Sequence, residues 1–165
     1  MNLLKQFEKS HLEETYLWIG STRIRKDFLL KRNISWEDHL KWNEQLKIDS
    51  TQKIFAIINK GHYCGNCGFK FINADDSKAE LWIYLGDPGC EGKGIAKLAL
   101  IELIKYGFET LKLNKIYLHV ADFNLRAIEI YKRLGFKSEG FFVDDYKKDN
   151  TYFSIHRFYL LNQFN

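Results

Sequence analysis

The stretch "GDPGCEGKGIAK", residues 86–97, constrains this chain more than any other segment. Its glycines lead directly into the apolar sequence "IAKLALIELI". At the start of a helix the first N–H groups have no partner inside the helix, and the positive end of the helix dipole lies there. Such an end binds anions well, so the segment predicts a site for a phosphate or a pyrophosphate.

Two common nucleotide motifs do not fit this segment. A Walker phosphate loop needs a Gly-Lys pair followed by Ser or Thr at a fixed distance from its first glycine, but residue 87 is Asp and residue 94 is Gly. A dinucleotide fingerprint needs a third glycine where Lys97 stands, and the preceding strand lies too far back for a tight turn. The turn therefore belongs to another class of anion site.

Composition sets the class of protein. A chain of 165 residues, 45% hydrophobic and 28% charged with one proline, suits a globular protein, and we expect one domain over residues 1–165. The net charge of +4 is spread along the chain, which argues against a nucleic-acid partner. No 18-residue apolar run occurs, and charges interrupt the N-terminal segment, so we expect neither membrane insertion nor a signal peptide, and a cytoplasmic location.

The sequence "CGNC" at Cys64 and Cys67 suggests a redox pair or half of a zinc site. A zinc site of that kind needs a second pair of ligands, but Cys90 stands alone and the histidines are scattered. Small buried cysteines also pack well in a glycine-containing strand. We therefore expect no metal and no disulfide.

The hydrophobic pattern predicts a mixed α/β order. Helices are expected at 10–20, capped by Ser10, and at 35–46, capped by Ser35 and packed through Trp36, Leu40 and Asn43. A hairpin that turns at 59–61 and a strand at 79–85 form an antiparallel meander.

The second half of the chain predicts a crossover unit. A helix follows the glycine turn and packs through Leu98, Ile101, Ile104 and Phe108, widened by Leu100 and Leu103. The strand at 115–121, a helix capped by Asn124 and stopped by Gly135, and an aromatic hairpin joined by "KKDN" complete the chain. We expect a mixed, mostly antiparallel sheet of six to seven strands with about four helices and two neighbouring parallel strands.

Two motifs resemble those of the GCN5-related N-acetyltransferases (GNAT family). The residues from Glu91 to Ala96 are similar to its pyrophosphate signature Gln/Arg-x-x-Gly-x-Gly/Ala, with Glu91 in place of Gln or Arg. The segment "NLRAIEIYKRLGF" resembles its Asn-x-x-Ala-x-x-x-Tyr-x-x-x-Gly-Phe helix at 124–136. The resemblance runs from about residue 54 to the end and is strongest for ribosomal-protein alanine and spermidine acetyltransferases. It implies the acyl-CoA N-acyltransferase fold and acetyl-CoA as acyl donor.

The resemblance also implies site residues. Bulged backbone at Ile83, Tyr84 and Leu85 would pair with the pantetheine amide, and Asn124 and Tyr131 would contact the cofactor. The pyrophosphate would lie on the backbone N–H groups of Gly92, Lys93, Gly94, Ile95, Ala96 and Lys97.

An amine that attacks the thioester needs an acid for the leaving thiolate and a base for its own proton. The resemblance places Tyr131 as the acid, although its position on an apolar helix face also fits core packing. Glu80, at the start of the strand that leads to the cofactor, is the candidate base, and a solvated strand end is the alternative.

The acceptor is predicted from the N-terminal third, which is similar to acetyltransferases of amino-sugar nucleotides such as the one in pseudaminic acid synthesis. We expect Arg25, His39, Trp42 and His156 near an amine acceptor, first of all an amino sugar carried on a nucleotide. A ribosomal-protein N-terminus or a polyamine is the alternative acceptor, and a non-catalytic CoA-binding module is the alternative function. An acidic pocket would favour the polyamine, and a basic or aromatic one near Arg25 and Trp42 the nucleotide. Exposed strand edges near the C-terminus suggest a homodimer.

Overall fold

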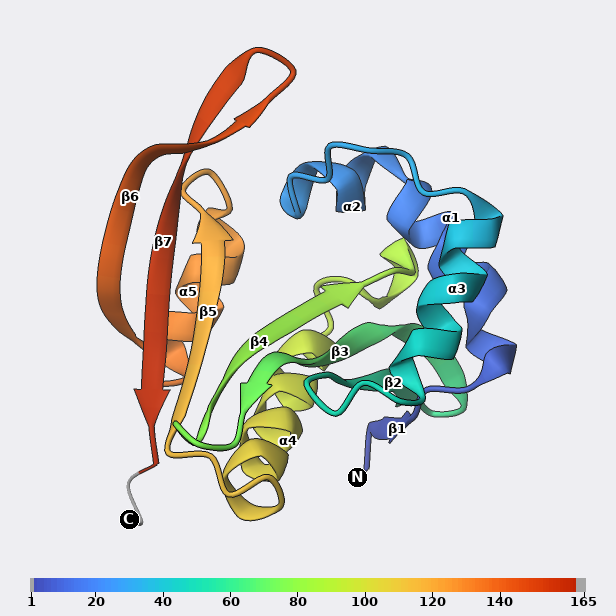
Figure 1. The fold of residues 1–165 in the computed structure, drawn as a ribbon, viewed down its shortest axis with the longest axis horizontal. Helices are drawn as coiled ribbons and strands as arrows, with labels where there is room; N and C mark the ends of the chain where they lie inside the picture. The colour runs from blue at the N-terminus through green and yellow to red at the C-terminus, as the bar shows by residue number, and fades with distance from the viewer. Residues whose placement is uncertain (1, 163–165) are drawn as a thin grey trace.

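The computed structural model describes residues 2–162, which form one seven-stranded sheet with helices on both faces (Figure 1). The elements in chain order are β1 (Leu4–Gln6), η1 (Lys9–His11), α1 (Leu12–Gly20), α2 (Thr22–Asp27), α3 (Trp36–Leu46), β2 (Lys53–Asn59), β3 (His62–Asn73), β4 (Lys78–Leu85), η2 (Pro88–Cys90), α4 (Ile95–Glu109), β5 (Lys115–Ala121), α5 (Leu125–Arg133), β6 (Lys137–Lys148) and β7 (Thr151–Leu161). None of the helices within these residues has the length and apolar character needed to cross a membrane.

The sheet has the strand order β1-β2-β3-β4-β5-β7-β6, and only β4 and β5 are parallel. This arrangement confirms the predicted meander, the crossover unit and the C-terminal hairpin. Two short elements were not predicted from the sequence, the edge strand β1 and the six-residue helix α2. Both are too short to produce a clear hydrophobic period.

The sheet opens between β4 and β5. Their pairing is limited to Lys78–Glu80 on β4 and Lys115–Tyr117 on β5, and beyond these residues the two strands diverge (Figure 1). On its other edge β4 stays paired with β3 up to Leu85. The segment 81–85 therefore has one edge that faces an opening and not a strand.

Helix α4 packs against the sheet through a different face from the one predicted. Its buried residues are Ile95, Ala99, Leu100, Leu103 and Gly107, whereas Leu98 and Ile101 are about half exposed. A Cβ at Gly107 would lie 2.7 Å from the Phe69 ring, so small residues let this helix approach the sheet closely. Because α4 is apolar on most sides, its hydrophobic period did not identify the buried face.

The N-terminal helices cover the opposite face. A buried polar network joins α1 to the sheet: Asn66 Nδ2 donates to Thr15 Oγ1 at 3.0 Å and to the Tyr84 hydroxyl at 2.8 Å. The cap by Ser35 is confirmed, because its hydroxyl accepts from Asp38 N at 3.1 Å. The cap by Ser10 is wrong, because Ser10 lies inside η1 and α1 begins after His11.

Candidate functional site

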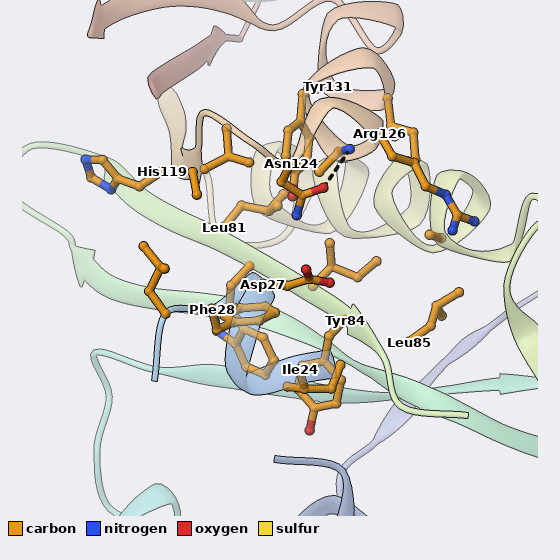
Figure 2. A pocket seen from close by; sticks show the side chains of 18 of the residues that line it. Ile24, Asp27, Phe28, Leu81, Tyr84, Leu85, His119, Asn124, Arg126 and Tyr131 are labelled. Carbon is orange, nitrogen blue, oxygen red and sulfur yellow. Dashed lines mark hydrogen bonds between the residues drawn. The ribbon is translucent and has the colours of Figure 1, made fainter. Parts of the chain in front are cut away.

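A pocket of about 500 Å³ lies where β4 and β5 diverge. Residues of α5 approach it from one side and residues of α2 from the other, with β4 between them (Figure 2). The glycine turn, the edge of β4 and the Asn-capped helix α5 all contribute residues to this one pocket. The segments that carry the two sequence motifs thus meet in space.

The glycine turn has the backbone of an anion site. Gly92 and Gly94 have φ angles of +73° and +76°, a left-handed conformation that favours glycine. Gly94 is the N-cap of α4, and no side chain caps this helix. Among the described residues no acceptor is bonded to the N–H groups of 92–97, so these donors are available to a ligand.

Glu91, the residue that departs from the family signature, is held between two arginines. Its carboxylate lies 2.5 Å from Arg23 of α2 and 3.0 Å from Arg126 of α5. Arg23 and Arg126 thus offset the negative charge of Glu91 together with that of Asp27, which interacts with both arginines. Lys93 and Lys97 in the turn itself add positive charge. An anion bound there therefore meets a favourable potential even though residue 91 itself is acidic.

The backbone at Ile83, Tyr84 and Leu85 differs from the predicted bulge. The ladder between β3 and β4 is regular from Glu80 to Leu85, and the opening arises because β5 turns away. Arg23 donates to the carbonyl oxygens of Leu85 at 2.9 Å and of Gly86 at 2.6 Å. Helix α2 is thereby attached to the end of the open strand.

Asn124 and Tyr131 both line the pocket from α5 (Figure 2). Asn124 caps the helix, since its Oδ1 accepts from Ala127 N at 3.2 Å. Tyr131 is buried among the core residues, and this burial raises the pKa of its hydroxyl. The hydroxyl makes no hydrogen bond to any residue of the described chain, so it remains a protonated donor that can serve a ligand.

Glu80 lies at the last paired position of β4, opposite Tyr117 of β5. Its side chain is 9% exposed and lies 3.2 Å from His119 Nδ1 and 3.1 Å from Lys70 Nζ. Burial alone would raise the pKa of Glu80, but the bonds from His119 and Lys70 outweigh it and hold that pKa below its ordinary value. His119 was missed in the sequence, and only the pairing of β5 with β4 brings it to the pocket.

The four residues predicted to contact the acceptor are not brought to this pocket. Arg25 donates to the carbonyl oxygens of Arg32 and Leu30 and fixes the loop after α2. His39 is 2% exposed and its Nε2 lies 3.1 Å from the Leu12 carbonyl oxygen, and burial lowers its pKa. Trp42 stacks on His39, and His156 packs beside Phe141 on the outer strands.

Other residues line the pocket on the side of α2 and β6, in place of the four predicted acceptor contacts. Asp27 and Phe28 reach the pocket from α2 and its C-terminal end, Trp82 from β4 and Asp145 from β6. Burial raises the pKa of Asp27, while Arg23 opposes this shift. Neither Asp27 nor Asp145 forms an ion pair with a described residue. Asp145 lies in the acidic segment "FVDDYKKD" at 142–149, whereas α2 gave no signal in the sequence.

Known proteins share this architecture. The model of the acetyltransferase (GNAT) domain matches residues 3–137. An uncharacterised N-acetyltransferase p20 of Bacillus licheniformis is 32% identical over 76% of this chain and 71% of its own. Acetyltransferase PseH of Campylobacter jejuni is 29% identical over 79% of this chain and 81% of its own.

Among solved structures, the spermidine N-acetyltransferase of Vibrio cholerae in complex with CoA and spermine superposes with a TM-score of 0.91 at 26% identity, over 96% of this chain and 94% of that one. The match covers the glycine turn, the open strand and the helix that carries Tyr131. The chain therefore belongs to the GNAT family and is an N-acetyltransferase that uses acetyl-CoA as its acyl donor.

Proposed function

We propose that this enzyme transfers acetyl to a primary amine by direct attack within a ternary complex, and that its preferred acceptor is a cationic polyamine. The amine nitrogen attacks the thioester carbonyl carbon, the carbon–sulfur bond breaks, and the CoA thiolate leaves. The N–H groups of 92–97 hold the pyrophosphate, and the open edge at Ile83, Tyr84 and Leu85 takes the pantetheine amide as a strand would. Asn124 lies beside that arm.

Tyr131 is the proposed acid. Its raised pKa keeps the hydroxyl protonated, and a protonated hydroxyl without a protein partner can donate to the leaving thiolate. Glu80 is the proposed base for the amine proton, acting through a water or through His119, which it orients at 3.2 Å. The lowered pKa of Glu80 keeps the carboxylate ionised, so that it can hold His119 or a water in position to take the amine proton.

The acceptor class rests on one observation: the two carboxylates of the pocket without an ion-pair partner are Asp27 and Asp145. Glu80 and Glu91 are each paired with cationic side chains. Asp27 and Asp145 thus place negative charge at the acceptor end, and this charge attracts a molecule with more than one ammonium group. The Vibrio relative crystallised with spermine is consistent with this choice.

A nucleotide-linked amino sugar is the second candidate. It is favoured by the likeness to PseH, which extends over 79% of the chain, and by Phe28 and Trp82, whose rings line the pocket and can stack on a base or a sugar. The sequence favoured this acceptor through the N-terminal third, which is similar to acetyltransferases of amino-sugar nucleotides and rich in aromatic residues, and it predicted contacts from Arg25 and Trp42. Because those two residues lie outside the pocket, we propose the polyamine as the first acceptor and the amino sugar as the second.

The experiment is thiol release from acetyl-CoA with spermidine, with UDP- and dTDP-linked amino sugars, and with a peptide that has a free N-terminal Ala. Spermidine should give the highest kcat/KM, and Asp27→Asn should lower it about fivefold, the value of one partly exposed charge pair. Asp75→Asn, in an exposed turn away from the pocket, is the matched control. Turnover only with the sugar nucleotides would contradict the polyamine proposal. Stabilisation by acetyl-CoA without turnover on any amine would instead favour a non-catalytic module.

We also propose a homodimer through the outer strand β6. It is the edge of the sheet, and Phe141, Phe142 and Val143 on it are 50%, 40% and 72% exposed. Light scattering of the purified chain should give twice the monomer mass. The Val143→Lys variant should give the monomer mass. A monomeric mass for the parent chain at micromolar concentration would contradict this proposal.

A further inference from the structure

A cluster of metal-binding side chains lies at the base of the glycine turn, outside the pocket described above. The ligating atoms of His62, Cys64 and Cys90 all lie within 4.8 Å of one another. His62 and Cys64 come from the start of β3, and Cys90 comes from η2, the turn before Glu91. The sequence did not predict this group, because Cys64 and Cys90 are 26 residues apart. Cys67, the second cysteine of "CGNC", does not belong to the group.

Asp87 contacts two members of the cluster. Its Oδ2 lies 2.5 Å from His62 Nε2 and 3.8 Å from Cys90 Sγ. Its Oδ1 accepts from Gly89 N at 2.7 Å, which fixes the orientation of the carboxylate. The three cluster residues therefore offer two sulfur atoms and one nitrogen, and the Asp87 carboxylate orients the His62 ring.

Backbone hydrogen bonds also hold together the segments that carry these residues. The Cys64 carbonyl oxygen accepts from Gly86 N at 2.8 Å and from Asp87 N at 3.2 Å. Cys64 and Cys90 are buried, at 0% and 4% exposure, whereas the His62 side chain is 63% exposed. The cluster is thus preformed, with thiols on the inside and an open side through which an ion can enter.

The donor set selects the ion. Calcium and magnesium take oxygen ligands, whereas two thiolates with an imidazole suit zinc. In a tetrahedral zinc site the Zn–S bonds are about 2.3 Å and the ligand atoms lie about 3.3–3.8 Å apart, so atoms that lie within 4.8 Å of one another would move closer on binding one ion. We propose that His62, Cys64 and Cys90 bind one Zn²⁺ with a water at the fourth position, and that Asp87 orients the His62 ring.

The role of this site follows from its position. The ion would tie the start of β3 to the segment 87–90, and the next residues form the turn that receives the anion. Acetyl transfer in this family needs no metal, and the ion takes no part in the reaction. It would instead reduce the mobility of the base of the cofactor turn, so its loss would lower thermal stability and weaken the binding of acetyl-CoA.

The test begins with the full chain, stripped of metal under reducing conditions and titrated with Co²⁺ as a spectroscopic probe. Thiolate-to-cobalt charge-transfer absorption that saturates near one equivalent, and that Zn²⁺ removes by displacement, is the expected result. Added Zn²⁺ should also raise the melting temperature. Absence of the charge-transfer band in the folded parent chain would overturn the proposal without recourse to any variant.

Variants then identify the ligands. Cys64→Ala and Cys90→Ala should abolish the charge-transfer band, and Asp87→Asn, which keeps the Oδ1 contact to Gly89, should weaken Co²⁺ binding about tenfold. Cys67→Ala is the matched control, since Cys67 is equally buried, belongs to the same "CGNC" stretch and lies outside the cluster. Far-UV circular dichroism checks that each variant is folded. Unchanged Co²⁺ binding in Cys90→Ala, or a Cys64–Cys90 disulfide in place of metal in the chain as purified, would refute the site.

Discussion

The two sides of the pocket are built in different ways. The proposed cofactor side consists of backbone groups on consecutive residues, namely the turn at 92–97 and the open edge of β4, together with one capped helix. The proposed acceptor side consists of side chains from α2, β4, β5 and β6 that meet only in the folded chain. A sequence motif can specify the first kind of site, because its geometry is local. It cannot specify the second, because the partners are distant in the chain.

The largest effect should follow from removing the proposed acid, which belongs to the cofactor side but acts in the transition state. Tyr131→Phe should lower kcat about 100-fold, while the KM for acetyl-CoA stays within about twofold, because only the proton donor is lost. Steady-state kinetics measure both values. Tyr106→Phe, which alters a tyrosine packed on Phe55 outside this pocket, is the control. Full activity of Tyr131→Phe would remove this residue from the mechanism.

Glu80→Gln should have the next largest effect and should reveal a dependence on pH. It should lower kcat about tenfold or more through loss of the base. Burial favours the neutral acid, but the bonds from His119 and Lys70 outweigh this effect. The pKa of Glu80 in the folded chain therefore lies below the ordinary 4.5. Folding therefore favours the ionised carboxylate above that ordinary value, and this stabilisation is lost as the pH falls through the lowered pKa.

Urea unfolding of Glu80→Gln and of the parent chain tests this linkage. The parent should be more stable at neutral pH, and the difference in unfolding free energy should shrink in acid. A difference that grows as the pH falls would contradict this prediction. It would mean that burial affects the pKa of Glu80 more strongly than the contacts with His119 and Lys70 do.

Gly94→Ala should have a smaller effect and should test the backbone side of the comparison. The left-handed conformation at φ +76° costs a residue with a side chain about 1–2 kcal/mol, so the KM for acetyl-CoA should rise about tenfold with kcat nearly unchanged. Gly20→Ala, at the end of α1 where an added Cβ meets no atom within 4 Å, is the control. Equal KM values for both variants would mean that the turn does not hold the pyrophosphate.

Arg25→Ala should have the smallest effect on catalysis. Its two hydrogen bonds to backbone carbonyls within the chain give it a structural role, so we expect loss of about 1 kcal/mol of stability and no change in the KM of any acceptor. Thermal unfolding and the acceptor panel measure the two quantities. A several-fold rise in acceptor KM without loss of stability would restore the role that the sequence suggested for Arg25.

The same contrast explains how far the sequence could be interpreted. Asn124 and Gly135 have local backbone roles, and their positions as helix cap and helix stop were predicted correctly. Gly94, the N-cap of α4, lies within the glycine turn that the sequence placed before this helix. His39 looked like a free polar group on a helix, but the fold buries its ring against Leu12. His119 and Asp27 carried no signal, because a histidine in a strand and an aspartate in a six-residue helix become neighbours of the pocket only through long-range pairing.

The opening between β4 and β5 leaves the sheet incomplete in the free protein. Past Glu80, the main chain of β4 presents polar groups along one edge that no strand of the described chain satisfies. A donor molecule laid along that edge would act as a missing strand, and its binding would finish the hydrogen-bond ladder that the polypeptide leaves unfinished. The amide protons of Ile83 and Leu85 should accordingly exchange quickly in the free enzyme and slowly once CoA is present. Binding of acetyl-CoA would then complete the sheet, and the sheet would open again each time CoA leaves after turnover.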